Sequence, residues 1–362
     1  MKTIYQIQNN IAQADTLPND FYFDPKVWET LKEKAFAQSW QFVGDAQGIF
    51  VGPENAYPFC LLDKYLDEPL LLSKQGEKIQ CLSNVCTHRG FLLLNHPAKL
   101  KKIVCAYHGR RFGLDGKFEH MPEFEGVADF PRPCEHLTEI PLKKWKRFLF
   151  VSLKPAFDFE PIAAKLEERL GFLPLENFRF APEYSKTYHV HAHWALYCDN
   201  YLEGFHIPFV HHSLNKMLDF GSYTTECYDH MCLQIGYADQ GGETFDLPQN
   251  HPDYGREVTA YYYWIFPNFM LNFYPWGVQL NIVRPYSPDF CKVEFLYYIH
   301  NQNTMNRMEG EKLAEKVERE DEFVVEGVQK GLKSRFYSTG RFSPEREQGV
   351  HHFHKMLANC LK

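Results

Sequence analysis

Two short segments, Cys86-Thr-His88 and Cys105-Ala-Tyr-His108, decide how the first half of this sequence is interpreted. Sixteen residues separate them, so the pattern reads C-x-H and then C-x-x-H. Two thiolates and two imidazoles can hold a tetrahedral zinc ion, but zinc sites usually keep their cysteines in one arm and their histidines in the other. Here each arm carries one of each, which suits a two-iron, two-sulfide cluster with two Cys on one iron and two His on the other. The spacing therefore predicts such a [2Fe-2S] cluster at Cys86, His88, Cys105 and His108, with zinc as the alternative.

The residues around these ligands carry a family resemblance. Cys86-Thr-His-Arg-Gly90, Cys105-Ala-Tyr-His-Gly109 and Phe112-Gly-Leu-Asp-Gly116 resemble the Rieske domain of ring-hydroxylating, Rieske-type non-haem iron oxygenases. Respiratory-chain Rieske proteins add a cysteine to each loop, whereas these loops contain no extra one. One position departs from the oxygenase pattern: Arg110 follows His-Gly where the family commonly has Trp.

A second pair of histidines, His206 and His211, lies in the segment 200–211. Non-haem iron that activates oxygen takes two His and one carboxylate on one side and keeps open positions. On an unbroken helix, residues five apart lie roughly 140° apart, so the two rings could not share a metal. Pro208 between them should end or kink the helix and let the rings converge, and Glu203 lies three residues before His206, on the same helical side. The alternative for two histidines in a Tyr- and Phe-rich segment is ordinary packing or a surface site.

This segment, Asn200-Tyr-Leu-Glu203-Gly-Phe-His206 followed after four residues by His211, resembles the catalytic iron motif of the same oxygenase family. The resemblance implies that His206 and His211 are iron ligands and that Asn200 and Glu203 are catalytic. The family usually has Asp where this chain has Glu203, and carnitine-type oxygenases have Glu. There the carboxylate bridges a Rieske histidine of a neighbouring subunit to a ligand histidine, so the resemblance also implies a homotrimer. It extends from about residue 40 to the end of the chain.

The third ligand should be a carboxylate farther along the chain, and Asp321 is the predicted one. It lies within an apolar stripe, where a carboxylate is costly to bury unless it is paired or binds metal. Glu320 lies toward the edge of the stripe and Glu322 faces away, while Glu318 and Glu326 count as ordinary acids of a charged helix. The Glu320-Asp321 segment also resembles the family segment that supplies the aspartate ligand. The stripe consists of Leu313, Val317, Val324, Val328 and Leu332.

The overall pattern predicts an α+β protein in three parts. Residues 1–40 form a helical segment that packs on the catalytic domain, with Asp24-Pro25 opening a helix. Residues 41–155 read as the all-β Rieske domain of short strands and turns. Residues 156–362 form the catalytic domain, which the family fold implies is an antiparallel sheet flanked by helices (helix-grip-like). Within it, we expect strands at 258–266 and 291–300 and helices at 305–333 and 344–361.

Composition excludes several other classes of protein. The 362 residues carry a net charge of −7, which argues against a nucleic-acid binder with its basic stripe. No apolar run approaches the ~20 residues of a membrane helix, and the N-terminus lacks the apolar stretch of a secretory signal. Ten cysteines are too sparse for a disulfide scaffold. We therefore expect a cytoplasmic protein with neither a membrane nor a nucleic acid as its partner.

The predicted function is that of a terminal oxygenase containing a [2Fe-2S] cluster and a mononuclear Fe(II). The chain has no Gly-rich dinucleotide loop, so electrons should come from a separate NAD(P)H-dependent reductase. With O2 it would hydroxylate, or oxidatively demethylate, a small organic substrate. The aromatic stretch 260–276 could form a cage for a quaternary ammonium compound around Trp264 and Trp276, or a pocket for an aromatic ring compound. A pure Rieske electron carrier is a further alternative, against which the second motif counts. Histidines 351, 352 and 354 are expected at the surface or an interface.

Overall fold

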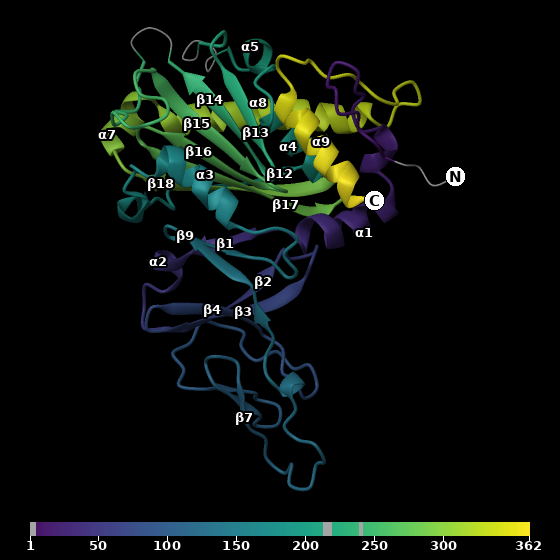
Figure 1. Ribbon diagram of the computed structural model, residues 1–362, viewed down its shortest axis with the longest axis vertical. Coiled ribbons are helices and arrows are strands. Elements are labelled where there is room, and N and C mark those ends of the chain that lie inside the picture. Colours follow the sequence, from purple (N-terminus) through teal and green to yellow (C-terminus); the bar gives the residue numbers. More distant parts are fainter. Residues whose placement is uncertain (1–4, 213–218, 239–241) are drawn as a thin grey trace. The chain divides into compact units, whose positions relative to one another are not determined.

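The computed structural model, which describes residues 5–212, 219–238 and 242–362, divides the chain into two units (Figure 1). The smaller unit consists of residues 37–157. The larger unit consists of residues 1–36 together with residues 158–362, so the chain enters it, leaves it and returns.

Short antiparallel strands build the smaller unit. They form sheets in the orders β1-β10-β9, β2-β3-β4-β8 and β5-β6-β7. Leu71 and Leu82 of the four-stranded sheet share a buried core with Cys86 and Cys105. The strands are β1 (Gln41–Asp45), β2 (Ala56–Leu61), β3 (Glu68–Gln75), β4 (Lys78–Ser83), β5 (Ile103–Val104), β6 (Arg111–Phe112), β7 (Phe118–His120), β8 (Glu139–Ile140), β9 (Leu142–Trp145) and β10 (Phe148–Val151), with the short helices α2 (Ala46–Ile49) and η3 (Pro133–Glu135) between them.

One antiparallel sheet organises the larger unit. Its strands follow the order β11-β18-β17-β16-β15-β14-β13, and β12 also pairs with β18. The strands expected at 258–266 and 291–300 are present as β15 and β18, and the α+β class is confirmed. The strands are β11 (Arg179–Phe180), β12 (Lys186–Val190), β13 (Thr224–Tyr228), β14 (Met231–Tyr237), β15 (Val258–Ile265), β16 (Phe269–Tyr274), β17 (Gly277–Ser287) and β18 (Phe290–Ile299).

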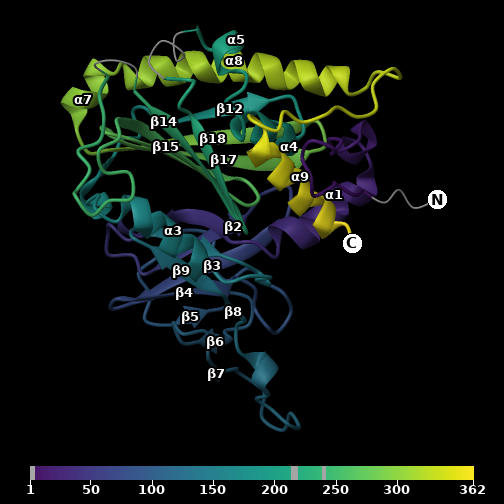
Figure 2. The ribbon, with the colours of Figure 1, turned by 45° about the horizontal axis from the view of Figure 1, so that its top comes forward.

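Helices flank this sheet, and Figure 2 shows the longest, α8, running across it. Helix α4 contacts both α8 and β17. None of the helices in the described residues combines the length and apolar character needed to cross a membrane. The helices of the larger unit are η1 (Asn19–Tyr22), α1 (Pro25–Leu31), η2 (Lys32–Phe36), α3 (Glu160–Leu170), η4 (Leu175–Asn177), α4 (Trp194–Tyr201), α5 (Ile207–Val210), α7 (Gln302–Arg307), α8 (Gly310–Gly331) and α9 (Gln348–Cys360).

The single helix expected at 305–333 is in fact two helices, α7 and α8. The break falls at Glu309, whose φ of 48° is left-handed and cannot continue a helix. Gly310 then starts α8, and a Cβ there would lie only 3.2 Å from the indole nitrogen of Trp276. The break therefore lets the start of α8 approach Trp276 closely.

The N-terminal segment is held to the larger unit by a buried histidine. Asp24 caps α1 by accepting the amide of Lys26, as expected from the Asp-Pro pair. His354 of α9 accepts the amide of Leu17 at 3.1 Å, and its other ring nitrogen lies 3.0 Å from Asp199. The histidines of α9 were expected at the surface or an interface, but His351 and His354 are buried within the larger unit because α9 covers the N-terminal segment and α4.

Arg110, which departs from the family pattern, is a buried cation paired with a carboxylate and packed against an aromatic ring. Its guanidinium lies 2.5 Å from the carboxylate of Glu135 and 4.7 Å from the ring centre of Phe118. Although burial alone would raise it, hydrogen bonds from Arg110 and Arg132 lower the pKa of Glu135. The planar guanidinium thus stacks on an aromatic ring while neutralising a buried acid.

Replacing Arg110 with Leu should destabilise the smaller unit because it leaves Glu135 buried beside only the exposed Arg132. Loss of one partner of a buried ion pair costs about 3–5 kcal/mol. The midpoint of urea unfolding, followed by fluorescence, should fall accordingly. Lys117→Ala, which removes an exposed pair with Asp115, is the matched control and should change the midpoint little. Equal midpoints for the two variants would show that the Arg110–Glu135 pair contributes no stability.

Candidate active site

The two loops of the smaller unit that carry the first motif fold alike. In each loop a glycine amide donates to the carbonyl of the cysteine four residues earlier: Gly90 to Cys86 and Gly109 to Cys105, both at 3.0 Å. Both glycines are left-handed, with φ of 70° and 71°. Only glycine adopts this conformation without steric cost. The loops therefore present their Cys-x-His and Cys-x-x-His segments in equivalent ways.

These loops bring the two thiols together and the two imidazoles together. Cys86 and Cys105 are buried, and burial, together with the neighbouring Cys105 thiol, raises the pKa of Cys86. The rings of His88 and His108 lie 4.8 Å apart. Within the described residues, the buried Nδ1 of His88 has no hydrogen-bond partner. Two thiols and two imidazoles, each grouped in a pair, fit a [2Fe-2S] cluster with one pair on each iron.

In the larger unit, the second motif lies on a turn between two helices, and not on one helix. Helix α4 ends at Tyr201, and α5 begins after His206 with Pro208 in its first turn. The expectation that Glu203 and His206 share a helical side was therefore wrong, as was the expectation that Pro208 ends a helix. The turn still brings them into contact: Glu203 accepts the His206 amide at 3.0 Å.

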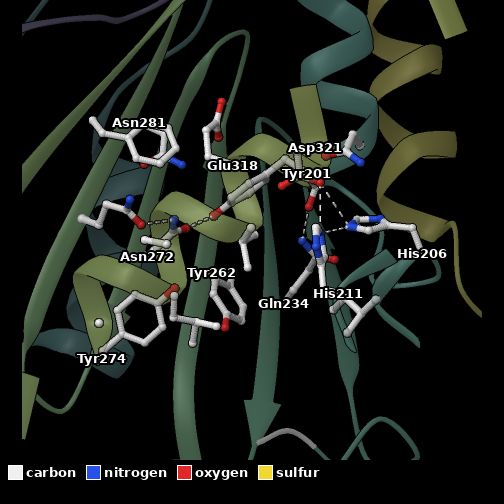
Figure 3. Close-up of a pocket in the computed structure, with 18 of the residues that line it drawn as sticks. Tyr201, His206, His211, Gln234, Tyr262, Asn272, Tyr274, Asn281, Glu318 and Asp321 are labelled. Carbon is white, nitrogen blue, oxygen red and sulfur yellow. Dashed lines mark hydrogen bonds and ion pairs between the residues drawn. The ribbon is translucent and has the colours of Figure 1, made fainter. Parts of the chain in front are cut away.

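Three side chains converge where the sequence predicted a metal. The Nε2 atoms of His206 and His211 lie 3.0 Å apart, and Asp321 Oδ1 lies 3.0 Å from His211 Nε2 and 3.6 Å from His206 Nε2 (Figure 3). The three atoms thus face a common point. Two imidazoles and one carboxylate on one side of an ion are the donor set that suits non-haem Fe(II).

Each of these imidazoles has its own carboxylate on the opposite ring nitrogen. Glu203 Oε1 lies 2.6 Å from His206 Nδ1, and Glu320 Oε2 lies 2.8 Å from His211 Nδ1. Such a partner fixes the tautomer so that Nε2 is free to bind metal. Burial alone would lower the pKa of His211, but its hydrogen bonds to Asp321 and Glu320 raise it. Sequence reasoning placed Glu320 at the edge of the apolar stripe and missed this contact.

Helix α8 buries more of its acids than the sequence suggested. Glu318 is only 2% exposed, and Tyr197 donates to its Oε2 at 2.5 Å. Burial, with the neighbouring charge of Asp321, raises the pKa of Glu318 well above its usual range. Glu322 does not face solvent either: it is half-buried and accepts from Arg319 at 2.8 Å. The expectation failed because the face that α8 packs against α4 and β12 is displaced by one position from the predicted stripe: Val325 is buried and Val328 is exposed.

A cavity opens next to the three converging side chains (Figure 3). Its floor is a row of residues directly opposite one another on four neighbouring strands: Gln234, Tyr262, Asn272 and Gln279. Asn272 accepts from Tyr201 at 2.6 Å and donates to Gln279 at 3.2 Å. The remaining described lining residues are Tyr197, Asn200, Glu203, Ile207, Tyr223, Tyr274, Trp276, Asn281, Phe295, Met308, Gly310, Leu313, Ala314, Val317 and Glu318.

The two tryptophans expected in an aromatic cage have different environments. Trp276 lines the cavity and stacks on Tyr274, with ring centres 5.1 Å apart and planes inclined by 12°. Trp264 is fully buried, packs 5.0 Å from Phe353 of α9 and does not line the described cavity. The assignment of Trp264 to the cage was wrong. Trp264 follows Tyr262 by two residues on β15, and α9 covers the sheet at Trp264.

Comparisons with known proteins agree with this arrangement. Residues 178–362 match the family of ring-hydroxylating alpha subunits (catalytic domain), and residues 59–131 match the Rieske [2Fe-2S] domain. The chain is 28% identical to the chloroplastic choline monooxygenase of Arabidopsis thaliana, over 97% of this chain and 84% of the relative. It is also 28% identical to the carnitine monooxygenase oxygenase subunit of Escherichia coli K12, over 98% of this chain and 96% of the relative.

Two solved structures share the fold. One is the quaternary ammonium Rieske monooxygenase CntA in complex with L-carnitine, with a TM-score of 0.75 and 22% identity over 98% of this chain and 97% of that one. The other is naphthalene 1,2-dioxygenase with bound indole, with a TM-score of 0.68 and 17% identity over 98% and 94%. The chain therefore belongs to the ring-hydroxylating alpha-subunit family and is a Rieske non-haem iron oxygenase, with a [2Fe-2S] domain and a catalytic domain that binds mononuclear iron.

Proposed function

We propose that this oxygenase hydroxylates a small quaternary ammonium compound, using O2 and electrons from a separate NAD(P)H-dependent reductase. The observation that carries the proposal is the convergence of His206, His211 and Asp321 beside a cavity with aromatic and acidic walls. A hydroxyl group placed on a carbon bound to nitrogen leads to loss of that carbon as an aldehyde. Demethylation is therefore one outcome of the same reaction.

Each metal centre has its own ligand set in this proposal. His206, His211 and Asp321 hold Fe(II) in the domain 156–362, and the bound iron supplies O2 activation at its open positions. Cys86 and Cys105 hold one iron of the cluster in the domain 41–155, while His88 and His108 hold the other. The N-terminal segment packs on the catalytic domain in this proposal, which the grouping of residues 1–36 with the larger unit and the bond from Leu17 to His354 support. Glu203 and Glu320 keep the two ligand imidazoles in the metal-binding tautomer.

The walls of the cavity favour a cation as substrate. Tyr262, Tyr274 and Trp276 offer aromatic faces, and such faces attract quaternary ammonium groups. The carboxylates of Glu203 and Asp321 also line it, and no Lys or Arg stands among the lining residues that the structure describes. The choline and carnitine monooxygenases found as relatives are named for compounds that contain a quaternary ammonium group.

The polar floor argues against the alternative, an aromatic hydrocarbon substrate. Gln234 and Asn281 line the cavity, and each has a buried side-chain oxygen with no partner among the described residues. With Asn272 and Gln279 they give the cavity a polar wall, with which an apolar ring forms no hydrogen bonds. The polar substituents of a small ammonium compound can form them.

We further propose that the enzyme works as a homotrimer in which Glu203 connects two subunits. One oxygen of Glu203 bonds to the Nδ1 of His206, and the residue is only partly buried. The second oxygen accepts the His206 amide and, with a further lone pair, can also meet a cluster histidine, His88 or His108, of a neighbouring subunit. Asn200 lines the same cavity beside Glu203 and completes the set of proposed catalytic residues.

Substrate-dependent O2 consumption tests the proposed function directly. Reduced enzyme, supplied with NADH and a generic Rieske reductase, should consume O2 with a methylated ammonium compound and release one equivalent of hydroxylated product or formaldehyde. A panel of neutral aromatic compounds should give no product. Turnover of an aromatic compound without turnover of any ammonium compound would contradict the proposed substrate class.

Asp321→Ala should remove the mononuclear iron and leave the cluster intact, because the three-ligand set loses its carboxylate. The expected iron content is about two per chain, with an unchanged visible spectrum of the cluster. Glu315→Ala is the control on the same helix, since Glu315 is exposed and pairs with Lys186. If Asp321→Ala retains the iron content of this control, a different residue supplies the third ligand.

Trp276→Leu should weaken binding of a trimethylammonium substrate by about 1–2 kcal/mol, the range of a desolvated cation–π contact. Trp276→Phe keeps an aromatic face and should lose less. Isothermal titration of the oxidised holoenzyme measures both variants. Equal affinity of the parent protein for a neutral tert-butyl analogue would show that charge plays no part in recognition.

Glu203→Gln should slow electron transfer between subunits while both metal centres remain loaded. Glutamine keeps the length and one acceptor of the side chain but loses the charge. Stopped-flow reoxidation of the pre-reduced cluster, with substrate and O2 present, measures this step. Reoxidation at the parent rate in fully iron-loaded trimer would leave Glu203 with only the orientation of His206.

A further inference from the structure

Two cysteines face each other across the hairpin of β13 and β14. Cys227 and Cys232 are directly opposite in the antiparallel register, with Tyr228 and Met231 as the next pair toward the turn. Their sulfur atoms are 3.6 Å apart. Directly opposite residues of antiparallel strands have Cα atoms about 4.5–5.5 Å apart, which lies within the range of disulfides, about 4.4–6.8 Å. Bond formation therefore requires rotation of the two side chains and no change of strand register.

The two thiols differ in access and in acidity. Cys227 is exposed, whereas Cys232 is 1% exposed. The Cys232 thiol hydrogen-bonds to Cys227 and lowers the pKa of Cys227, while the same contact and burial raise the pKa of Cys232. An accessible thiol of lowered pKa beside a shielded second thiol is the arrangement of a reacting cysteine and a resolving cysteine.

The hairpin that carries the pair contributes to a wall of the cavity, although neither cysteine lines it. Gln234, two residues after Cys232 on β14, lines the cavity and donates to the carbonyl of Tyr201 at 2.7 Å. Tyr223, immediately before β13, lines it as well. A bond between the strands would therefore tie together two segments that contact the substrate space.

We propose that Cys227 and Cys232 form a peroxide-sensitive dithiol that closes to a disulfide. The Cys227 thiolate attacks one oxygen of hydrogen peroxide, the O–O bond breaks, and the departing hydroxide takes a proton to become water. The Cys232 sulfur then attacks the sulfur of the resulting sulfenic acid, the S–S bond forms and the S–O bond breaks, and the departing hydroxide takes the proton of the Cys232 thiol to become a second water. In total, two thiols lose two electrons and two protons, and one peroxide is reduced to two waters.

Peptide mass spectrometry of the peroxide-treated holoenzyme tests this site. Trypsin releases both cysteines in one peptide, residues 217–256, because no Lys or Arg lies between them. After anaerobic reduction and removal of the reductant, hydrogen peroxide is added at a dose that leaves the visible spectrum of the cluster unchanged. The peptide should then lose the mass of two hydrogens and resist alkylation, and dithiothreitol should restore both properties.

Variants separate the roles of the two thiols. Cys232→Ser should leave Cys227 as a sulfenic acid that reacts with dimedone, while Cys227→Ser should leave Cys232 reduced and alkylatable. Cys134→Ser removes an exposed cysteine outside the hairpin and should change nothing in the peptide. The proposal is overturned if both cysteines stay alkylatable while Cys60 or Cys134 oxidises, or if Cys227 in the parent protein passes to sulfinic acid without a disulfide.

Discussion

The position of α8 against α4 and the end of β12 is the constraint on which the candidate iron site depends. Asp321 follows His211 by 110 positions and meets it only if α8 has the correct rotation and register. Three polar contacts, two of them buried, set that register. Gln329 accepts the amide of His193 at 3.1 Å and Glu318 accepts from Tyr197, both in the interior, while Glu326 accepts the amide of His191 at 3.0 Å in an exposed position. A slip of one residue would leave the buried groups of Gln329 and Glu318 unpaired, which is costly in a dry interior.

Carboxyl groups of α8 and of the turn after α4 determine which nitrogens and oxygens of the site carry protons. The carboxylates of Glu203 and Glu320 hold the outer nitrogens of the two imidazoles, so both inner nitrogens point at one place. Desolvation favours the protonated form of Glu318, one helical turn from Asp321, and so limits the negative charge next to the ligand set. The site therefore contains enough carboxylates to attract a metal dication and a cationic substrate, while the buried Glu318 adds no further negative charge.

Sequence alone predicted those features of the fold and the site that depend on the spacing of residues along the chain. The Cys-x-His and Cys-x-x-His pattern predicted the loops of the smaller unit, and the apolar stripe selected Asp321 from a run of acids. The predictions that were wrong concerned features that depend on tertiary packing. The stripe could not show that Glu318 and Glu320 make inward contacts. The buried residues Glu318, Val325 and Gln329 of α8 each lie one position after a stripe residue, and the stripe residue Val328 is exposed. Trp264 and Trp276 look equivalent in sequence, but α9 covers the first and leaves the second in the cavity. The burial of Arg110 against Phe118 could not be predicted because it depends on an ion pair with Glu135, which lies 25 residues farther along the chain.

The central claim is that this chain carries two distinct iron centres, a cluster in the smaller unit and a single ion in the larger one. Metal and acid-labile sulfide analysis of protein purified without oxygen tests it most directly, with an electron paramagnetic resonance spectrum of the reduced sample. The account predicts about three irons and two sulfides per chain, with the spectrum of a cluster ligated by two Cys and two His. Stoichiometric zinc without labile sulfide would contradict it.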